Sequence, residues 1–357
     1  MKRHLTRRSL LSAGSVAAVS VGLWSAARPV AAEAEESFTY SIVGGSFGQG
    51  EIKAFITGPK FQENNHIQIS YDYAQDNIRA AKTIASCHNP IFTVVDAQPL
   101  QADLLADGGC IQGYDLDIVT NYNDIIDAAT EPPRNGIKDF FASFDIMALA
   151  LTYNVKEMQE PSSYQALLSP KLKGRIAIPA FDWVGPQFLY GVNWALGGTA
   201  DNLDRGFQFI AELVKKNNAL VLDNADSADQ AFTRGEIVAM PFWNGRTNIL
   251  AKGGIPVKLA YPKGWVPTGS GIVITRGTKF PRLANLLVNN FLAPENQVKI
   301  TAAFGYPPSN KYAKLPPNMA DWGIPPAAFK DLARLDYKVV TANMAKNLER
   351  WNSEVLG

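Results

Sequence analysis

Trp243 and Arg246 follow a short apolar stretch at residues 237–241, and both side chains are suited to recognising a small charged molecule. An arginine guanidinium forms two parallel hydrogen bonds with a carboxylate or phosphonate group. A tryptophan three residues earlier supplies a flat apolar wall or a face for a cation. The pattern predicts that Arg246 holds an anionic group of a ligand beside Trp243. The alternative is a solvent-facing arginine next to a core tryptophan.

Asp182 and Trp183 stand in the equivalent place after another apolar stretch, Arg175–Pro179. A carboxylate beside an indole ring is suited to an ammonium group. Asp182 has a second use, as the N-cap of a helix that begins at Gly185, and the sequence favours neither use over the other.

Further candidate ligand contacts lie beside other apolar stretches. Asp96 follows Ile91–Val95, Asp145 precedes Ile146–Tyr153, and Trp265 stands in a loop from which it can close a site. The arginine is suited to binding an anionic group, and the aspartates with their tryptophans are suited to binding a cationic group. These residue types together predict a small zwitterion, such as an amino acid or a γ-aminobutyrate-like molecule.

Residues 44–48 match G-x-S-x-G, the turn that presents a nucleophilic serine in α/β hydrolases, with Ser46 at its centre. Such a hydrolase needs an acid and then a histidine later in the chain. The later histidines, His66 and His88, both fall within the next two secondary-structure units. We therefore expect no catalysis here.

The same turn has a second interpretation as a binding element. Free N–H groups of Gly45, Ser46 and Phe47 at the start of a helix can hold an anionic or polar group of a ligand. The alternative is a turn that merely joins a strand to a helix.

Composition narrows the class of protein. The chain has 357 residues, 46% of them hydrophobic and 19% charged, with a formal net charge of +1. This length suggests two domains, and the abundance of apolar residues excludes intrinsic disorder. A net charge of +1 lacks the excess of basic residues that nucleic-acid-binding proteins usually carry. With three His and two Cys, the chain has few residues from which a His/Cys metal site could be built. We expect no metal and no cofactor.

The first 34 residues predict an export signal. Basic residues at 2–8 precede a small and apolar stretch at 10–27, and small residues at 31–34 form a cleavage region. The run at 6–11, Thr-Arg-Arg-Ser-Leu-Leu, resembles the twin-arginine export motif. Alternatives are an uncleaved anchor and an ordinary export signal that carries two arginines. Removal of residues 1–34 changes the net charge to −3. We expect a monomer in the periplasm.

Export places Cys87 and Cys110 in an oxidising compartment. They flank a strand and a helix of an α/β unit, which puts both at the same edge of the sheet. This position predicts a disulfide between them. Two unpaired, buried thiols are the alternative.

Strands and helices are expected to alternate along the chain in two series. This order predicts an α/β fold in which mainly parallel sheets are covered by helices. The expected strands are at 40–43, 67–73, 91–95, 146–153, 175–179, 219–222, 237–241, 257–260 and 271–275. The expected helices are at 51–64, 77–86, 99–106, 185–196, 203–216, 225–234, 246–252, 283–292, 294–303, 325–335 and 337–351.

Open α/β sheets bind ligands beyond the carboxyl ends of their strands. If the two series form two lobes, these ends can face each other across a cleft. The loops expected at the cleft are 45–47, 72–77, 96–98, 181–183, 242–246 and 263–270, the last of which ends at Ser270.

Several motifs occur in the order seen in periplasmic solute-binding proteins of ABC importers, the type that includes spermidine/putrescine binders. Residues 151–154 (Leu-Thr-Tyr-Asn) look like the first crossover strand, and residues 169–179 resemble the P-K-x-K-G-x-I-A-I-P entry into the second lobe. Residues 269–274 resemble the return crossover, and residues 293–297 and 305–310 resemble the closing helix and the loop after it. The resemblance runs from about Phe38 to Trp351.

The resemblance implies a two-lobed (type II) periplasmic-binding-protein fold with the ligand cleft between the lobes. Lobe 1 would comprise residues 35–145 and 276–320, lobe 2 residues 146–275, and residues 321–357 would form helices packed on the lobes. The lobes would close on a small solute about a hinge near 144–149 and 271–275, and a membrane permease with its ATPase would accept it.

Alternatives to an importer receptor remain open at this stage. They are an exported enzyme on a related fold and the soluble sensor of a chemoreceptor. Polyamine binders in the family carry an acid and an aromatic residue shortly before the return crossover, whereas Val266-Pro267-Thr268-Gly269 has no acid, so polyamine binding is in doubt. Iron binders in neighbouring families use adjacent tyrosines, and this chain has no Tyr-Tyr pair.

Overall fold

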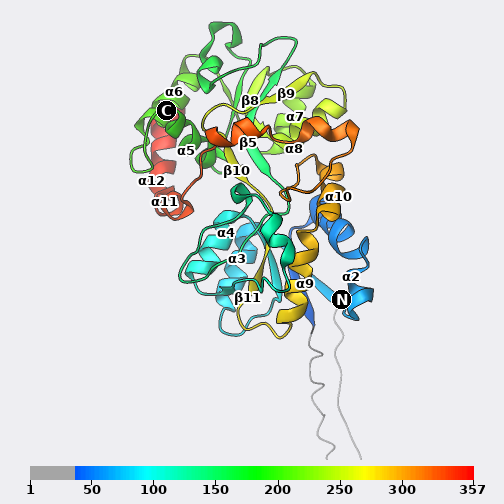
Figure 1. Ribbon diagram of the computed structural model, residues 1–357. Helices are drawn as coiled ribbons and strands as arrows, with labels where there is room; N and C mark the ends of the chain where they lie inside the picture. Colours follow the sequence, from blue (N-terminus) through cyan, green and yellow to red (C-terminus); the bar gives the residue numbers. More distant parts are fainter. Residues whose placement is uncertain (1–36) are drawn as a thin grey trace, which may run out of the picture. The chain divides into compact units, whose positions relative to one another are not determined.

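The computed structural model describes residues 37–357 (Figure 1). The expected export signal at 1–34 lies outside the described residues. Within the described part of the chain, no helix is both long and apolar enough to cross a membrane.

The first sheet has five strands in the order β2-β1-β3-β11-β4. Its strands are β1 (Phe38–Ile42), β2 (Ile69–Tyr73), β3 (Val94–Ala97), β4 (Ile111–Gln112) and β11 (Gly271–Thr275). β1 is parallel to β2 and β3, as expected for strands joined through helices, whereas β11 is antiparallel to β3 and β4. The carboxyl ends of β1, β2 and β3 therefore meet at one edge.

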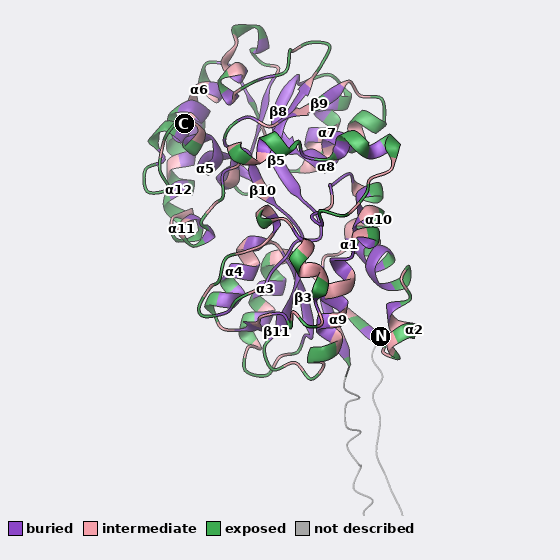
Figure 2. Ribbon diagram, viewed as in Figure 1, coloured by how far each residue is buried: buried purple, intermediate pink, exposed green. Residues whose placement is uncertain are grey.

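Helices flank this sheet and bury its apolar side chains (Figure 2). Phe55, Phe144 and Phe291 form a buried aromatic core in which the rings of Phe55 and Phe291 stack at 4.1 Å between centroids. The elements are α1 (Gly45–Glu51), the π-helical turn η1 (Ile52–Thr57), α2 (Phe61–Asn65), α3 (Asp76–Ala85), α4 (Pro99–Asp107), α9 (Pro281–Phe291) and α10 (Pro294–Phe304).

The second sheet is built around the long buried strand β5 (Met147–Asn154). β10 (Val266–Thr268), β8 (Ala239–Trp243) and β9 (Val257–Ala260) all pair with β5 in antiparallel fashion. The expectation of a mainly parallel second sheet is therefore wrong for these pairs. β8 and β9, joined by a helix, do run in the same direction, but β5 separates them and runs the opposite way. A further parallel pair consists of β6 (Ala177–Pro179) and β7 (Leu220–Leu222).

The helices around the second sheet are α5 (Gly185–Ala195), α6 (Asp204–Lys215), α7 (Ala225–Thr233) and α8 (Asn244–Lys252). The chain ends with α11 (Tyr337–Ala342), α12 (Met344–Arg350) and the π-helical turn η8 (Trp351–Leu356). Short 3-10 helices are η2 (Thr120–Asp124), η3 (Asp127–Ala129), η4 (Tyr164–Leu168), η5 (Pro170–Leu172), η6 (Pro317–Trp322) and η7 (Pro326–Asp331).

Three backbone segments lie side by side where the chain passes between the two sheets. Phe144 N–H donates to the carbonyl of Ser270 at 2.8 Å, and Ile146 N–H donates to the carbonyl of Pro307 at 2.8 Å. A Cβ on Gly269 would lie 2.5 Å from the Asp145 carbonyl oxygen, so only glycine allows this approach. Main-chain hydrogen bonds thus tie the three segments together at the junction.

The predicted disulfide between Cys87 and Cys110 is confirmed, with Cα atoms 4.8 Å apart. It joins the segment just after α3 to the residue before β4, and the two cysteines are 23 residues apart in the sequence.

The double variant Cys87→Ala/Cys110→Ala should lose about 3 kcal/mol of unfolding free energy, because the cross-link restricts the unfolded chain over this loop length. Chemical denaturation of the variant and of oxidised wild type measures the difference. Equal midpoints and slopes would contradict the expectation, and wild type treated with reductant serves as the control.

Candidate functional site

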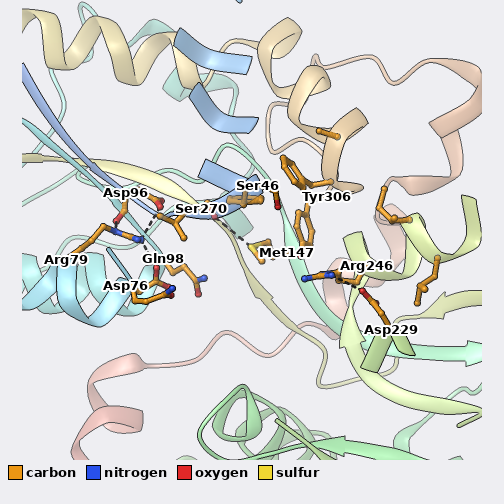
Figure 3. A pocket seen from close by; sticks show the side chains of 17 residues that line it. Ser46, Asp76, Arg79, Asp96, Gln98, Met147, Asp229, Arg246, Ser270 and Tyr306 are labelled. Atoms are coloured by element: carbon orange, nitrogen blue, oxygen red, sulfur yellow. Dashed lines mark hydrogen bonds and ion pairs between the residues drawn. The ribbon is translucent and has the colours of Figure 1, made fainter. Parts of the chain in front are cut away.

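A pocket of about 400 Å³ lies beyond the carboxyl ends of β1, β2 and β3 and is faced by α7 and α8 (Figure 3). Elements flanking both sheets contribute to its wall. The lining residues are Val43, Ser46, Phe47, Gln75, Asp76, Arg79, Asp96, Gln98, Met147, Asp229, Arg246, Ile249, Leu250, Ser270, Ala303, Phe304 and Tyr306.

Arg79, in the first turn of α3, is buried at one end of the pocket (Figure 3). Its terminal nitrogen Nη2 donates to Asp76 Oδ1 at 2.6 Å and to Asp96 Oδ2 at 3.0 Å. Nε and Nη1 donate to the carbonyls of Asp96 and Ala74. Four of the five guanidinium N–H groups are thus occupied. Two carboxylates against one guanidinium give this end of the pocket a formal charge of −1.

Buried carboxyl groups lie at and below this end. Burial raises the pKa of Asp96 to about 6, although Arg79 opposes the shift. Burial raises the pKa of Asp145 to about 8, against the lowering effect of the Ser270 N–H that donates to its Oδ1 at 2.8 Å. Glu51 accepts a hydrogen bond from the Tyr40 hydroxyl at 2.9 Å, and burial followed by the Asp96 charge raises its pKa.

Arg246 is in the first turn of α8 at the other end of the pocket (Figure 3). Its Nη1 donates to Asp229 Oδ2 at 2.7 Å and to Asp226 Oδ1 at 3.1 Å, both on α7. The Tyr306 hydroxyl, which is buried, is also hydrogen-bonded to Arg246, and burial raises the pKa of this tyrosine. Two of the five guanidinium N–H groups remain for a ligand, which is the number that one carboxylate uses.

An apolar wall separates the two charged ends. Met147 and Ser270 lie between the Arg79 cluster and the Arg246 cluster (Figure 3). The rings of Phe47 and Phe304 contact each other at 4.8 Å between centroids, and the α8 side chains Ile249 and Leu250 complete the wall. The pocket is therefore charged at its ends and apolar between them.

Five of the side chains singled out in the sequence meet in this pocket. Ser46, Phe47, Asp96, Arg246 and Ser270 all line it. Gly45 begins α1 with a φ of +75°, a conformation that glycine adopts without strain, and so turns the chain toward Ser46. Asp145 lies behind the wall, where it is fully buried and holds the Ser270 backbone.

The remaining candidates do not line this pocket. Asp182 is exposed to solvent, and Trp183 packs its ring against Phe242. Trp243 ends β8 with its side chain in the core of the second sheet. Trp265 is fully buried among apolar side chains and donates its indole N–H to the carbonyl of Ala328 at 2.9 Å. Trp243 and Trp265 are buried and Trp183 is half-buried, so packing of a large apolar ring accounts for their positions.

Sequence reasoning missed several lining residues. Gln75, Asp76 and Gln98 fall in loops that were expected at the cleft, but Arg79, Asp229 and Tyr306 were not singled out. Arg79 and Asp229 lie within helices, where charged residues usually face solvent. A signal was available for Tyr306, because it belongs to the 305–310 motif on which the resemblance partly rests.

Comparison with known proteins agrees with the fold. The model of the family described as bacterial extracellular solute-binding proteins matches residues 56–327. The chain therefore belongs to this family, and the predicted two-lobed α/β class is confirmed.

Individual relatives are more distant. Spermidine/putrescine-binding periplasmic protein 1 of Haemophilus influenzae is 33% identical over 111 residues, which span 30% of this chain and 30% of that protein. The structure of an ABC transporter protein from Clostridium perfringens has a TM-score of 0.75 at 21% identity and covers 89% of this chain and 100% of its own. The GABA receptor Atu4243 has a TM-score of 0.71 at 19% identity and covers 89% and 97%. These two structures share the fold.

Arg79→Met should lower the unfolding free energy by about 3–5 kcal/mol, because it removes the buried guanidinium that pairs with the carboxylates of Asp76 and Asp96. Lys82→Met on the same helix is the matched control. It removes a surface pair in which Lys82 Nζ lies 2.7 Å from Asp72 Oδ1, and its cost should be at most about 1 kcal/mol. Equal losses in urea denaturation would show that the Arg79 cluster contributes no more than a surface pair.

Asp145 should make the protein less stable as the pH rises. Its pKa is raised from 3.8 to about 8, so the folded state keeps a proton that the unfolded chain releases near pH 4. The unfolding free energy should fall between pH 4 and 8, by on the order of 5 kcal/mol from this group. Asp145→Asn should flatten the profile, and the exposed Asp182→Asn should not. Denaturation at pH 4, 6 and 8 measures both, and a parallel profile for Asp145→Asn would refute the assignment.

Proposed function

We propose that this chain is an extracytoplasmic receptor that captures a small zwitterion whose ammonium and carboxylate are separated by an apolar chain. The observation that carries the proposal is the arrangement of the pocket. Each end holds one arginine with two aspartates, but Arg246 retains two N–H donors, whereas four of the five N–H groups of Arg79 are occupied by the protein. A largely apolar wall lies between the two ends.

The ligand would lie along the wall with its charges at the two ends. Its carboxylate would accept hydrogen bonds from Arg246, where the protein excludes part of the water and so strengthens the interaction. Its ammonium would face Asp76 and Asp96, because Arg79 leaves these carboxylates with a surplus negative charge. The carbon chain would contact Met147 and Phe47.

Ligand capture would proceed by closure of the two lobes, the hinge motion of periplasmic binding proteins. The backbone segments that pass between the sheets at 144–146, 269–271 and 307–308 are the places where closure would bend the chain. A ligand that contacts both charged ends favours the closed form over the open one. We further propose that the closed receptor, as a monomer in the periplasm, delivers its ligand to an ABC permease.

The pocket supports binding without catalysis. Ser46 lines it, but the histidines that follow in the sequence, His66 and His88, are exposed and do not line it. A serine without a neighbouring base is a weak nucleophile. Ser46 instead offers a neutral hydroxyl to a polar group of the ligand.

A polyamine is the second candidate ligand. It is favoured by the partial match to a spermidine/putrescine-binding protein and by the lining, which carries three aspartates against two arginines. Against it stand the unoccupied N–H donors of Arg246, which would face an ammonium group. The two candidates differ in what they require of Arg246.

Three four-carbon probes separate the candidates: 4-aminobutanoate is a zwitterion, putrescine a dication and butanoate an anion. Calorimetry on wild type should show the tightest binding for 4-aminobutanoate. Arg246→Ala should weaken it by a factor of about 30 or more, because the carboxylate loses its charged partner. The exposed Arg234, at the end of α7, provides the control Arg234→Ala, which should bind as wild type does. Tightest binding of putrescine, unaffected by Arg246→Ala, would establish the polyamine alternative.

A further inference from the structure

Asp229 is the lining residue whose role the proposed function leaves open. It projects from the middle of α7, and its Oδ2 accepts a hydrogen bond of 2.7 Å from Arg246 Nη1 on the neighbouring helix α8. Its other oxygen, Oδ1, is buried without a hydrogen-bond partner in the described structure. A buried carboxylate oxygen without a hydrogen-bond partner costs stability, so we looked for a functional role of the Asp229 charge.

Asp226 contacts the same arginine but differs in its surroundings. Its side chain is 79% exposed and 3.1 Å from Arg246 Nη1, whereas that of Asp229 is 25% exposed. Solvent screens an exposed pair and leaves a partly buried one stronger. Of the two aspartates, Asp229 also lines the pocket. The two residues share a helix, a partner and a chemical type, and differ in burial.

Resting on the proposed function, we propose that Asp229 is a positioning and specificity-determining residue that restrains Arg246 and sets which ligand charge the pocket accepts. Its carboxylate anchors Nη1, so that the remaining edge of the guanidinium is presented to the ligand. Its negative charge partly offsets the positive charge of Arg246, so that an anion without an ammonium group gains less from the arginine than it would without Asp229. A ligand must then satisfy the acidic end as well.

The proposal has a consequence that a purely structural role lacks. Removal of the Asp229 charge makes the Arg246 end more positive, so affinity for an anion should rise while affinity for a dication should fall. A zwitterion has no net charge and should respond mainly to the lost restraint on Arg246. The sign of the change therefore depends on the charge of the probe.

The test compares Asp229→Asn and Asp226→Asn with wild type, using 4-aminobutanoate, putrescine and butanoate in calorimetry or in displacement. Asp229→Asn should bind butanoate about tenfold more tightly and putrescine about tenfold less tightly, since a charge a few ångströms away is only partly screened. It should bind 4-aminobutanoate less tightly. Asp226→Asn should shift each affinity in the same direction by a smaller factor, because its charge is more exposed. Asp229→Glu, which keeps the charge, should retain the wild-type order.

The outcomes separate this proposal from the proposed function. Equal shifts in the two Asn variants, or a loss of the same size for all three probes, would overturn the role of Asp229 while leaving the receptor intact. If wild type prefers putrescine, the zwitterion is wrong, yet opposite shifts for anion and dication still support Asp229. No binding of any probe by wild type would overturn both. Thermal melting checks the fold, and Asp229→Ser is the second neutral variant if Asp229→Asn does not fold.

Discussion

The buried contact between Arg79 and Asp96 is the interaction on which the pocket depends. Asp96 belongs to β3 and Arg79 to α3, and their hydrogen bonds tie the end of a central strand to the start of a helix. A guanidinium in the interior is tolerated because carboxylates and carbonyls surround it. Since those partners occupy four of its five N–H groups, Arg79 forms a fixed part of the pocket wall.

The two ends of the pocket have the same residue types but differ in burial and in the number of free hydrogen-bond donors. Each has an arginine held by two aspartates, but the Arg79 cluster is saturated and buried, whereas Arg246 is partly exposed with donors to spare. Burial rather than residue type therefore assigns the roles. Under the proposed function, such a site would discriminate by the net charge of a ligand and by the spacing of its charges, with Ser46 and Gln98 as neutral contacts.

The sequence predicted the alternation of strands and helices, the disulfide and the strand-end loops that carry Asp76 and Asp96. Those features follow from local periodicity and from the rule that loops after parallel strands meet at one edge. The sequence could not show which way the tryptophans face, because an indole beside a strand end can turn inward as readily as outward. Only the packing with Ile324 and Ala328 shows that Trp265 turns inward. Asp229 could not be identified from the sequence, because its interaction is with Arg246, which lies 17 residues later in the chain.

The place of β11 in the first sheet has a consequence for how the molecule is assembled. β11 lies between β3 and β4, and it pairs Val273 with Val95. The second sheet, in contrast, is complete within residues 147–268. During synthesis, the part of the chain around β5 can acquire its strands from one continuous stretch, whereas β3 and β4 of the first sheet stay unconnected until β11 has been made. Contacts between such distant residues form slowly. The half of the molecule that is made first is thus the half that is finished last.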